Sequence, residues 1–373
     1  MRPVRIPLFA ALLAAVLAAC GQPPATPGQP SGDGAASLGP SQAGPTPSET
    51  AAASPDPAPT EPAWRRVSAE VDGITPREDH TWTLDPEARV AYLFGGRTAD
   101  NVALDDLWAY DLDDGSWRRI DPPRRTPPAR FGHNAAWVEG IGLVVFAGQA
   151  GTAFFDDLWA FDPAAERWRR LASGGDAPVA RYGSCAALGP DGRLWISHGF
   201  TAENRRFADT RAYDFASGTW SDETPAGDVP VARCLHGCWW TDDGRLALFA
   251  GQTTGVLGLD DLWLLTPGPR QGTHEWNPVG VEPPIEARNL YAAAAWGSAN
   301  VIFGGQAVDG SRLADAYLLS PDGRSTRISV EGDRPGPRSG AELVADSSAQ
   351  RVLLFGGRDG RRAMSDLWEL TLP

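Results

Sequence analysis

The sequence contains no lysine: all 33 basic residues are arginine, against 47 acidic residues, and the net charge is −14. We interpret the lack of lysine as a mark of a GC-rich coding sequence and infer no mechanism from it. The shortage of positive charge argues against a general nucleic-acid binder, because a polyanion would be repelled. The apolar run at residues 6–19 is too short to span a bilayer. The abundant glycine, proline and tryptophan suit short strands joined by turns.

Residues 1–19 have the layout of a secretory signal, with two arginines followed by the apolar run and the letters "LAAC", which end at Cys20. This ending resembles a bacterial lipobox, which implies cleavage before Cys20 and lipidation of that cysteine. Acylation by two or more chains anchors a protein stably. An ordinary secretory signal with a chance cysteine is the alternative. Gly21 favours the outer membrane, so the expected location is the cell envelope, at the outer membrane or the outer face of the cell membrane.

The segment that follows the signal, from Cys20 to residue 62, is predicted to be a disordered tether. Residues 21–62 contain 11 prolines, no aromatic residue and no arginine. Such a composition cannot form a core, and we expect it to act only as a spacer.

From residue 77 onward, three markers recur together in six units of about 50 residues. Each unit opens with an arginine, continues with an apolar run that ends in a small residue plus glycine, and then has an aspartate. The arginines lie at 77, 130, 181, 233, 288 and 338, the glycines at 96, 148, 199, 251, 305 and 357, and the aspartates at 106, 157, 209, 261, 315 and 366. Each unit is predicted to form four strands, the last of which begins with tryptophan, as in "SWRRI".

These units resemble the kelch repeat, through the double glycine of "FGG" at 94–96, 303–305 and 355–357, the aromatic residue of the third strand, and the spaced tryptophans. The resemblance covers about 310 residues and implies a β-propeller similar in architecture to the central domain of galactose oxidase. A four-stranded blade cannot bury both of its faces alone, whereas a closed ring of blades can. The fold class predicted is therefore an all-β, six-bladed kelch propeller that spans residues 63–373.

The ring is predicted to be closed by a strand from the N-terminal end. The sixth unit stops at Pro373 with three strands, while a spare "AWRRV" precedes the first unit at 63–67. A strand at about residues 63–68 would complete the last blade. The alternative is that Trp64 belongs to the tether.

The kelch resemblance implies a ligand-binding mouth at the end of the ring where the first strands begin and the loops between strands two and three open. Candidates just after the glycine turns lie on loops and are favoured. The arginines that open the units, Arg77 and Arg338 among them, are weaker candidates, because they could instead pair with carbonyls or aspartates. A ring of arginines and amides suits a carboxylate or sugar ligand. The predicted ligand-binding residues are Arg97, Gln149, Gln252, Gln306, Arg358, Arg77 and Arg338.

Histidines and cysteines within the repeats do not indicate a metal site. His80, His133 and His236 each lie three residues after a repeat arginine, on separate blades, which favours packing over a shared ion. Cys185 and Cys238 are predicted to form a disulfide between adjacent blades, with Cys185–Cys234 as the alternative. The phenylalanines in the loops of units two and three suggest an apolar rim or, alternatively, anchors that fold back under the loops; they are Phe154, Phe155, Phe200 and Phe207.

No convincing catalytic set is present. The two tyrosines, two histidines and crosslinked cysteine of galactose oxidase-like copper sites do not converge here, and neither does the iron-binding spacing of nitrile-specifier proteins. The favoured function is a monomeric binding module without cofactor, which recognises a protein or a glycan outside the cytoplasm. A carbohydrate enzyme similar to sialate mutarotases or epimerases is the alternative, by analogy of fold alone. A structural envelope protein is a third possibility.

Overall fold

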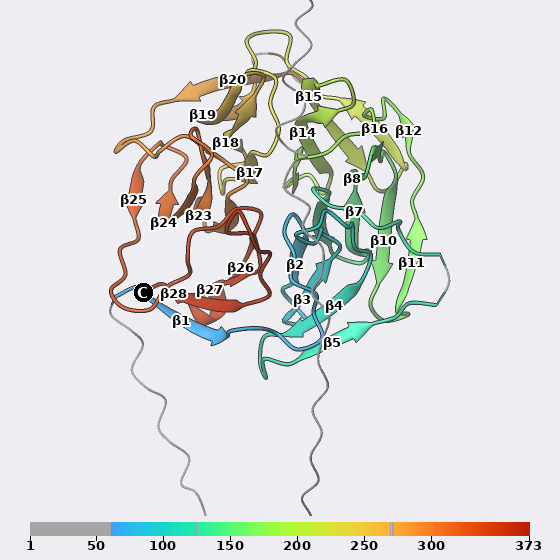
Figure 1. The fold of residues 1–373 in the computed structure, drawn as a ribbon. Helices are drawn as coiled ribbons and strands as arrows, with labels where there is room; N and C mark the ends of the chain where they lie inside the picture. The colour runs from blue at the N-terminus through green and yellow to red at the C-terminus, as the bar shows by residue number, and fades with distance from the viewer. Residues whose placement is uncertain (1–60, 124, 269, 271) are drawn as a thin grey trace, which may run out of the picture. The chain divides into compact units, whose positions relative to one another are not determined.

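The computed structural model describes residues 61–373 except residues 124, 269 and 271. These residues form the six blades of a propeller, each built on four antiparallel strands, which confirms the predicted fold (Figure 1). A short extra strand joins the fourth and fifth blades into one sheet. From the inner to the outer strand, blades 1 to 3 are β2(Thr81–Asp85), β3(Val90–Phe94), β4(Leu107–Asp111), β5(Trp117–Ile120); β6(Asn134–Val138), β7(Gly142–Phe146), β10(Leu158–Asp162), β11(Arg167–Arg170); and β13(Cys185–Leu188), β14(Leu194–Thr201), β15(Arg205–Asp214), β16(Thr219–Asp222).

Blades 4 to 6 follow the same order, and the outer strand of the last blade comes from the N-terminal end of the described chain. They are β17(Gly237–Trp240), β18(Leu246–Thr253), β19(Val256–Pro267), β20(His274–Val279); β22(Ala292–Trp296), β23(Ala299–Ala307), β24(Arg312–Leu319), β25(Ser325–Arg327); and β26(Glu342–Asp346), β27(Arg351–Phe355), β28(Leu367–Thr371), β1(Ala63–Ser68). Short extra elements are β8(Gln149–Ala150), β9(Ala153–Phe154), β12(Gly174–Gly175), β21(Arg288–Asn289) and the 3-10 turn η1(Ser347–Ala349).

Strand β1 closes the ring. It pairs antiparallel with β28, from Ala63 opposite Thr371 to Ser68 opposite Leu367. Trp64 turns inward from β1 and meets the ring of Phe303 in blade 5, with centroids 5.4 Å apart. The predicted N-terminal closing strand is confirmed, and Trp64 belongs to the propeller rather than to the preceding segment.

The apolar core is divided among the interfaces between blades. Each of the six hydrophobic clusters joins strands from two neighbouring blades, and together they include every adjacent pair. The second strands are buried along almost their whole length, as in the five buried residues of β7, because neighbouring blades cover both of their faces. This explains why the second strands read as continuous apolar runs rather than as an alternating pattern.

The sharp turn after each second strand depends on glycine. At Gly96 the backbone has φ +97°, and a Cβ there would lie 2.8 Å from His80 Cβ and 2.9 Å from the Glu78 carbonyl oxygen. A larger residue would therefore be strained and would also clash with the start of the first strand.

A disulfide joins the inner strands of blades 3 and 4. It links Cys185 to Cys238, with Cα atoms 5.7 Å apart, and Cys234 is a buried free thiol. This is the pairing that the sequence favours over Cys185–Cys234. Within the part of the chain that the structure describes, no helix has the length and apolar character needed to cross a membrane.

Candidate functional site

The repeat arginines are structural clamps. Each guanidinium is buried and binds the aspartate of its own repeat through two parallel hydrogen bonds of 2.6–3.1 Å, while one of its nitrogens also donates to a carbonyl at the end of the second strand. Arg77 and Arg338 are therefore not available to a ligand, and their prediction as mouth residues is corrected. Each repeat guanidinium is held in place because a buried arginine must hydrogen-bond its N–H groups to acceptors within the protein.

The repeat aspartates accept hydrogen bonds from side chains. In blade 2, Asp157 accepts from Arg130 and from the indole N–H of Trp159, which lies two residues further on. Burial would raise the pKa of Asp157, but the hydrogen bonds and charge of Arg130 outweigh it and hold that pKa below its usual value. The same indole contact explains the "DLW" letters of blades 1, 4 and 6.

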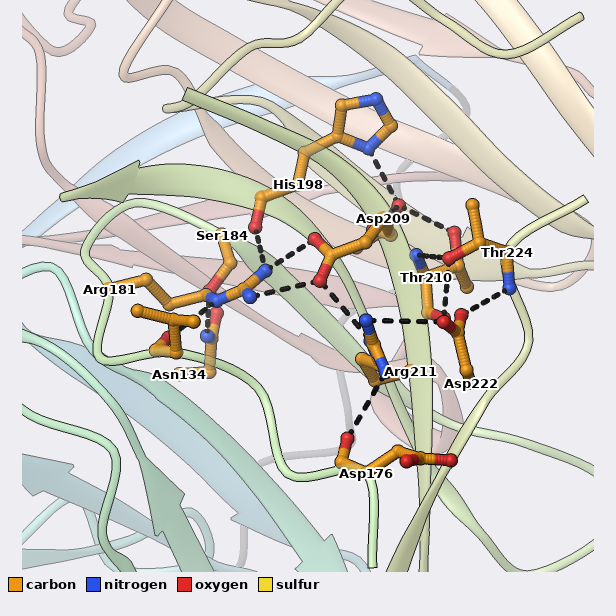
Figure 2. A network of polar contacts seen from close by, with 12 residues as sticks. Asn134, Asp176, Arg181, Ser184, His198, Asp209, Thr210, Arg211, Asp222 and Thr224 are labelled. Carbon is orange, nitrogen blue, oxygen red and sulfur yellow. Dashed lines mark hydrogen bonds and ion pairs between the residues drawn. The ribbon is translucent and has the colours of Figure 1, made fainter. Parts of the chain in front are cut away.

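Blade 3 shows how the clamp tolerates the loss of that tryptophan. Arg211 replaces it, and Figure 2 shows Asp209 between Arg181 and Arg211. Arg211 Nε donates to Asp209 Oδ2 at 3.2 Å, and Arg211 Nη2 pairs with Asp222 at 3.2 Å. The departure in sequence is thus a local substitution of one donor for another.

A closed ring of six backbone hydrogen bonds lies at the centre of the propeller; we call it the belt. One residue of each blade, two positions after the repeat arginine, donates its N–H to the carbonyl of its counterpart in the preceding blade, at 2.7–3.1 Å. All six have a left-handed backbone, with φ of 52–64°. The belt residues are Asp79, Gly132, Gly183, Leu235, Leu290 and Gly340. In each blade the chain passes the belt once, just before the inner strand, so the centre of the ring has one part on either side of the belt.

The compartment on the side where the blades begin contains the predicted ligand residues; we call it the mouth. There, the residue after each repeat arginine pairs across a short ladder with the residue after the glycine turn. The six pairs are Glu78–Arg97, Phe131–Gln149, Tyr182–Phe200, Cys234–Gln252, Asn289–Gln306 and Ser339–Arg358. The structure thus brings Arg97, Gln149, Gln252, Gln306 and Arg358 to one end of the ring, in equivalent positions.

One part of the mouth is charged. Arg97 and Arg358 share the Glu78 carboxylate, each at 3.2 Å, and Arg97 also contacts Asp79 at 2.9 Å. Both arginines remain about a quarter exposed. Burial raises the pKa of Asp79 to about 6, against the opposing charge of Arg97. Burial and the neighbouring guanidiniums of Arg358 and Arg97 lower the pKa of Arg312, which therefore belongs to the same cluster.

The sequence did not single out Glu78, Asp79 or Arg312 as mouth residues. The only signal was the pair "ED" directly after Arg77, where blades 2 and 3 have "FG" and "YG". Arg312 begins β24 and gave no signal at all.

Another part of the mouth is aromatic. The rings of Phe131 and Tyr182 are 5.7 Å apart, those of Phe154 and Phe200 are 5.9 Å apart, and Arg97 lies 4.6 Å from the Phe131 centroid. The other two loop phenylalanines fold back, as the alternative interpretation expected. Phe155 covers Arg130 at 4.4 Å, and Phe207 covers Arg181 at 4.2 Å, so both anchor their loops over the clamps.

The three mouth glutamines donate within their own surroundings. Gln149 Nε2 donates to the Gly151 carbonyl at 2.7 Å, and Gln306 Nε2 donates to the Gly310 carbonyl at 3.4 Å. Gln252 Nε2 contacts the Cys234 sulfur at 3.6 Å, and burial raises the pKa of that thiol. Among the described residues, none donates a hydrogen bond to an amide oxygen of these glutamines, so these oxygens retain their capacity to accept one.

The compartment on the other side of the belt is a cavity of about 500 Å³, which we call the channel. It is lined by the inner strands of the blades and includes His80, His133 and His236. The histidines are buried and neutral: burial lowers the pKa of His80 to about 3 and lowers the pKa of the other two well below the usual value. In the described part of the chain, no group of three or more acidic, histidine or cysteine side chains is placed to hold a metal ion.

Glu342 is one of two acidic side chains that line the channel, and the other is Asp79. It begins β26, and burial, together with the negative charge of Asp79, raises its pKa to about 8. The repeat arginines on either side, Arg77 and Arg338, are already engaged by their own aspartates.

Replacement of Glu342 by Gln is expected to remove a pH-dependent loss of stability. Because the folded pKa lies above that of the unfolded chain, the native state binds more protons between about pH 4.5 and pH 8, and its stability falls as pH rises through that window. Each pKa unit is worth about 1.4 kcal/mol; partial exposure to water in the channel reduces the effect. We expect the Gln variant to unfold like the wild type at pH 5 and to be more stable by about 2–3 kcal/mol at pH 9. Urea unfolding at both pH values measures this, and equal stabilities at pH 9 would contradict it.

The comparisons with known proteins agree with this architecture. A family model described as "KLHDC2/KLHL20/DRC7 Kelch-repeats domain" matches residues 58–251 and 223–373. The chain belongs to the kelch-repeat family. Kelch propellers generally bind proteins.

Similar curated proteins are plant kelch proteins. Adagio-like protein 3 of Oryza sativa is 26% identical over 75% of this chain and 46% of its own length. Adagio protein 3 of Arabidopsis thaliana is 27% identical over 83% of this chain and 52% of its length. Serine/threonine-protein phosphatase BSL2 of Arabidopsis thaliana is 27% identical over 69% of this chain and 27% of its length. This kelch chain thus spans about half the length of the Adagio relatives, and less of the phosphatase.

These relatives contradict the predicted location in a cell envelope. They are plant proteins named for Adagio and a protein phosphatase, not lipoproteins of a bacterial envelope. None of the three is named as a galactose oxidase, a mutarotase or another carbohydrate enzyme, so they lend no support to those resemblances. The predicted signal, Cys20 and nearly all of the predicted tether, residues 1–60, lie outside the described residues.

Proposed function

We propose that this kelch propeller recognises a protein segment at the mouth, through apolar contacts on the rim and carboxylates held by the arginines inside it. The observation that carries the proposal is where the exposed aliphatic residues lie. In the described part of the chain, seven large aliphatic side chains are more than a third exposed, and all but Val67 belong to the mouth end of the ring. These six are Val102, Val179, Val231, Val256, Leu257 and Val308.

The positions of these side chains form a rim. Val102 lies in the loop between β3 and β4, Val256 and Leu257 begin β19, and Val308 lies in the turn between β23 and β24, all of which follow glycine turns. Val179 and Val231 each precede a repeat arginine by two residues. Apolar side chains that gather at one place on an acidic protein are typical of a protein interface.

The charges inside the rim favour an acidic partner. Three guanidiniums, those of Arg97, Arg312 and Arg358, face two carboxylates, Glu78 and Asp79, and Arg206 lies over the Phe200 ring of the same mouth. The excess of positive charge suits a partner that brings a carboxylate of its own. The free amide oxygens of the glutamines would accept N–H groups of an extended segment.

Selection from a random peptide library on the full chain tests the proposal. We expect the selected peptides to combine apolar and acidic residues, and to lose roughly tenfold or more in affinity for the double variant Val256→Ser/Leu257→Ser. Val67→Ser is the matched control, because it removes an equally exposed aliphatic residue outside the rim. Fluorescence anisotropy measures the affinities, and the folding of each variant is checked by thermal unfolding.

The proposal is wrong if the selected peptides bind the double variant as tightly as the wild type, or if Val67→Ser weakens them equally. A glycan array probed in parallel covers the other ligand class. Retention of a glycan together with failure to select any peptide would also overturn the proposal.

A further inference from the structure

The channel has acidic groups and no basic ones. Of the side chains that line it, Asp79 and Glu342 carry the formal charges, and none is an arginine. This is unusual in a chain with 33 arginines. The remaining wall is formed by neutral histidines, hydroxyl and amide groups and the rings of Trp82, Trp240 and Tyr291. A cavity of about 500 Å³ with such a wall has the size and the mixture of apolar surface and few polar groups found in small-molecule sites.

A side-chain contact that two of the blade junctions make is missing between blades 6 and 1. In blade 1, Thr81, four residues after the repeat arginine, bonds His133, three residues after the arginine of blade 2, at 2.9 Å. In blade 2, Asn134 donates to Ser184 of blade 3 in the same register, at 2.7 Å. The equivalent residues at the junction between blades 6 and 1 are Glu342 and His80.

Neither member of that pair has a partner. Both ring nitrogens of His80 are buried without a hydrogen bond. Glu342 is only partly buried, and its carboxylate forms no hydrogen bond or ion pair with another described residue. Asn300, also on the channel wall and 2% exposed, has an amide oxygen without a partner. Buried polar atoms without partners are few in native proteins, and several of them along one wall indicate a site that something outside the chain satisfies.

We propose that the channel binds a small primary amine, whose ammonium group lies against the Glu342 carboxylate and donates to the acceptors left free on the wall. The acidic groups of the wall select a cation. The unpartnered groups include the Asn300 amide oxygen, which favours a cation with N–H donors, and the indole N–H groups of Trp82 and Trp240, which are donors themselves. The aromatic residues provide surface for an apolar or aromatic body, including cation–π contact with Trp82 or Trp240. The site is distinct from the mouth, and the two adjoin at the belt, whose residues also line the channel.

The ionisation of Glu342 gives the proposal a second signature. With a pKa raised to about 8, the carboxyl is largely protonated in the empty channel at neutral pH, and an ammonium ion favours its charged form. Binding therefore releases a proton. Of the other titratable groups on the wall, the histidines have lowered pKa values and burial raises the pKa of Tyr291 above its usual value, whereas the pKa of Asp79, raised to about 6, lies at the lower end of the same pH range.

Tyramine and its neutral analogue 4-ethylphenol test the proposal by isothermal titration of the full chain. We expect tyramine to bind about tenfold or more tightly than 4-ethylphenol, and Glu342→Gln to remove that difference. Tyramine affinity is expected to rise about tenfold from pH 6 to pH 8.5 in the wild type, and heats measured in buffers of different ionisation enthalpy should report proton release. The Val256→Ser/Leu257→Ser variant is the control, and its tyramine affinity should match that of the wild type.

Three results would each overturn the proposal: no tyramine binding, equal binding of the two compounds, or unchanged tyramine affinity in Glu342→Gln. Loss of tyramine binding in the mouth variant would place the ligand at the mouth and also contradict it. Because Gln has the shape of Glu and the same variant is expected to be at least as stable as the wild type, a folding defect does not account for a loss.

Discussion

Deletion of residues 63–68 is expected to destroy cooperative unfolding of the propeller or to lower its stability by more than about 5 kcal/mol. The deletion exposes the edge of β28, removes Trp64 from its contact with Phe303 and opens the ring between blades 6 and 1. Loss of a buried tryptophan alone costs about 3–5 kcal/mol, and the whole domain is expected to be stable by only about 5–15 kcal/mol.

Two point variants distinguish the contribution of the Trp64 side chain to stability from that of the whole strand β1. Trp64→Ala is expected to cost about 3–5 kcal/mol, whereas Arg65→Ala, on the exposed face of the same strand, should cost less than about 1 kcal/mol. Arg65 is 63% exposed and pairs with Glu369 at 3.1 Å. Thermal and urea unfolding of the full chain, followed by near-UV circular dichroism, measure all three variants. A full, cooperative transition at the wild-type midpoint after deletion of 63–68 would show that β1 does not close the ring.

The architecture could be predicted because the repeat markers recur at a regular spacing along the sequence. The repeat arginine, the glycine and the aspartate return together, so the number of blades and the spare strand at 63–67 follow from counting. The position of the mouth also followed, since residues after equivalent turns must lie at equivalent places. Arg97 and Arg358 were therefore placed correctly at the same end, and their convergence on Glu78 was not anticipated.

The belt and the channel could not be predicted, because they depend on backbone conformations that the residue types at these positions do not indicate. Glycine at 132, 183 and 340 is compatible with a positive φ, but Asp79, Leu235 and Leu290 adopt the same conformation without any such signal. The six hydrogen bonds of the ring hold those residues there. Likewise, the raised pKa of Glu342 arises from the closing of the ring, which brings β26 beside the start of blade 1.

The role of the repeat arginines was left open by the sequence and is decided by their burial. Arg130→Ala is expected to destabilise the propeller by about 3–5 kcal/mol, because it leaves the Asp157 carboxylate buried without its partner. In the wild type, Arg130 donates to Asp157 at 2.8 and 3.1 Å, to the Ala147 carbonyl at 2.8 Å and to the Pro128 carbonyl at 3.0 Å, so the loss extends to the backbone of two loops.

Arg118→Ala is the matched control, since Arg118 also pairs with a carboxylate, Glu166, at 2.7 Å, but both side chains are about half exposed. It should cost less than about 1 kcal/mol. The double variant Arg130→Ala/Asp157→Ala is expected to be less destabilised than the sum of the two single variants, because neither charge is then left alone. Urea unfolding of the four proteins gives the coupling. If Arg130→Ala costs no more than Arg118→Ala, the clamp does not stabilise the blade, and the arginine would again be open to a role at the mouth.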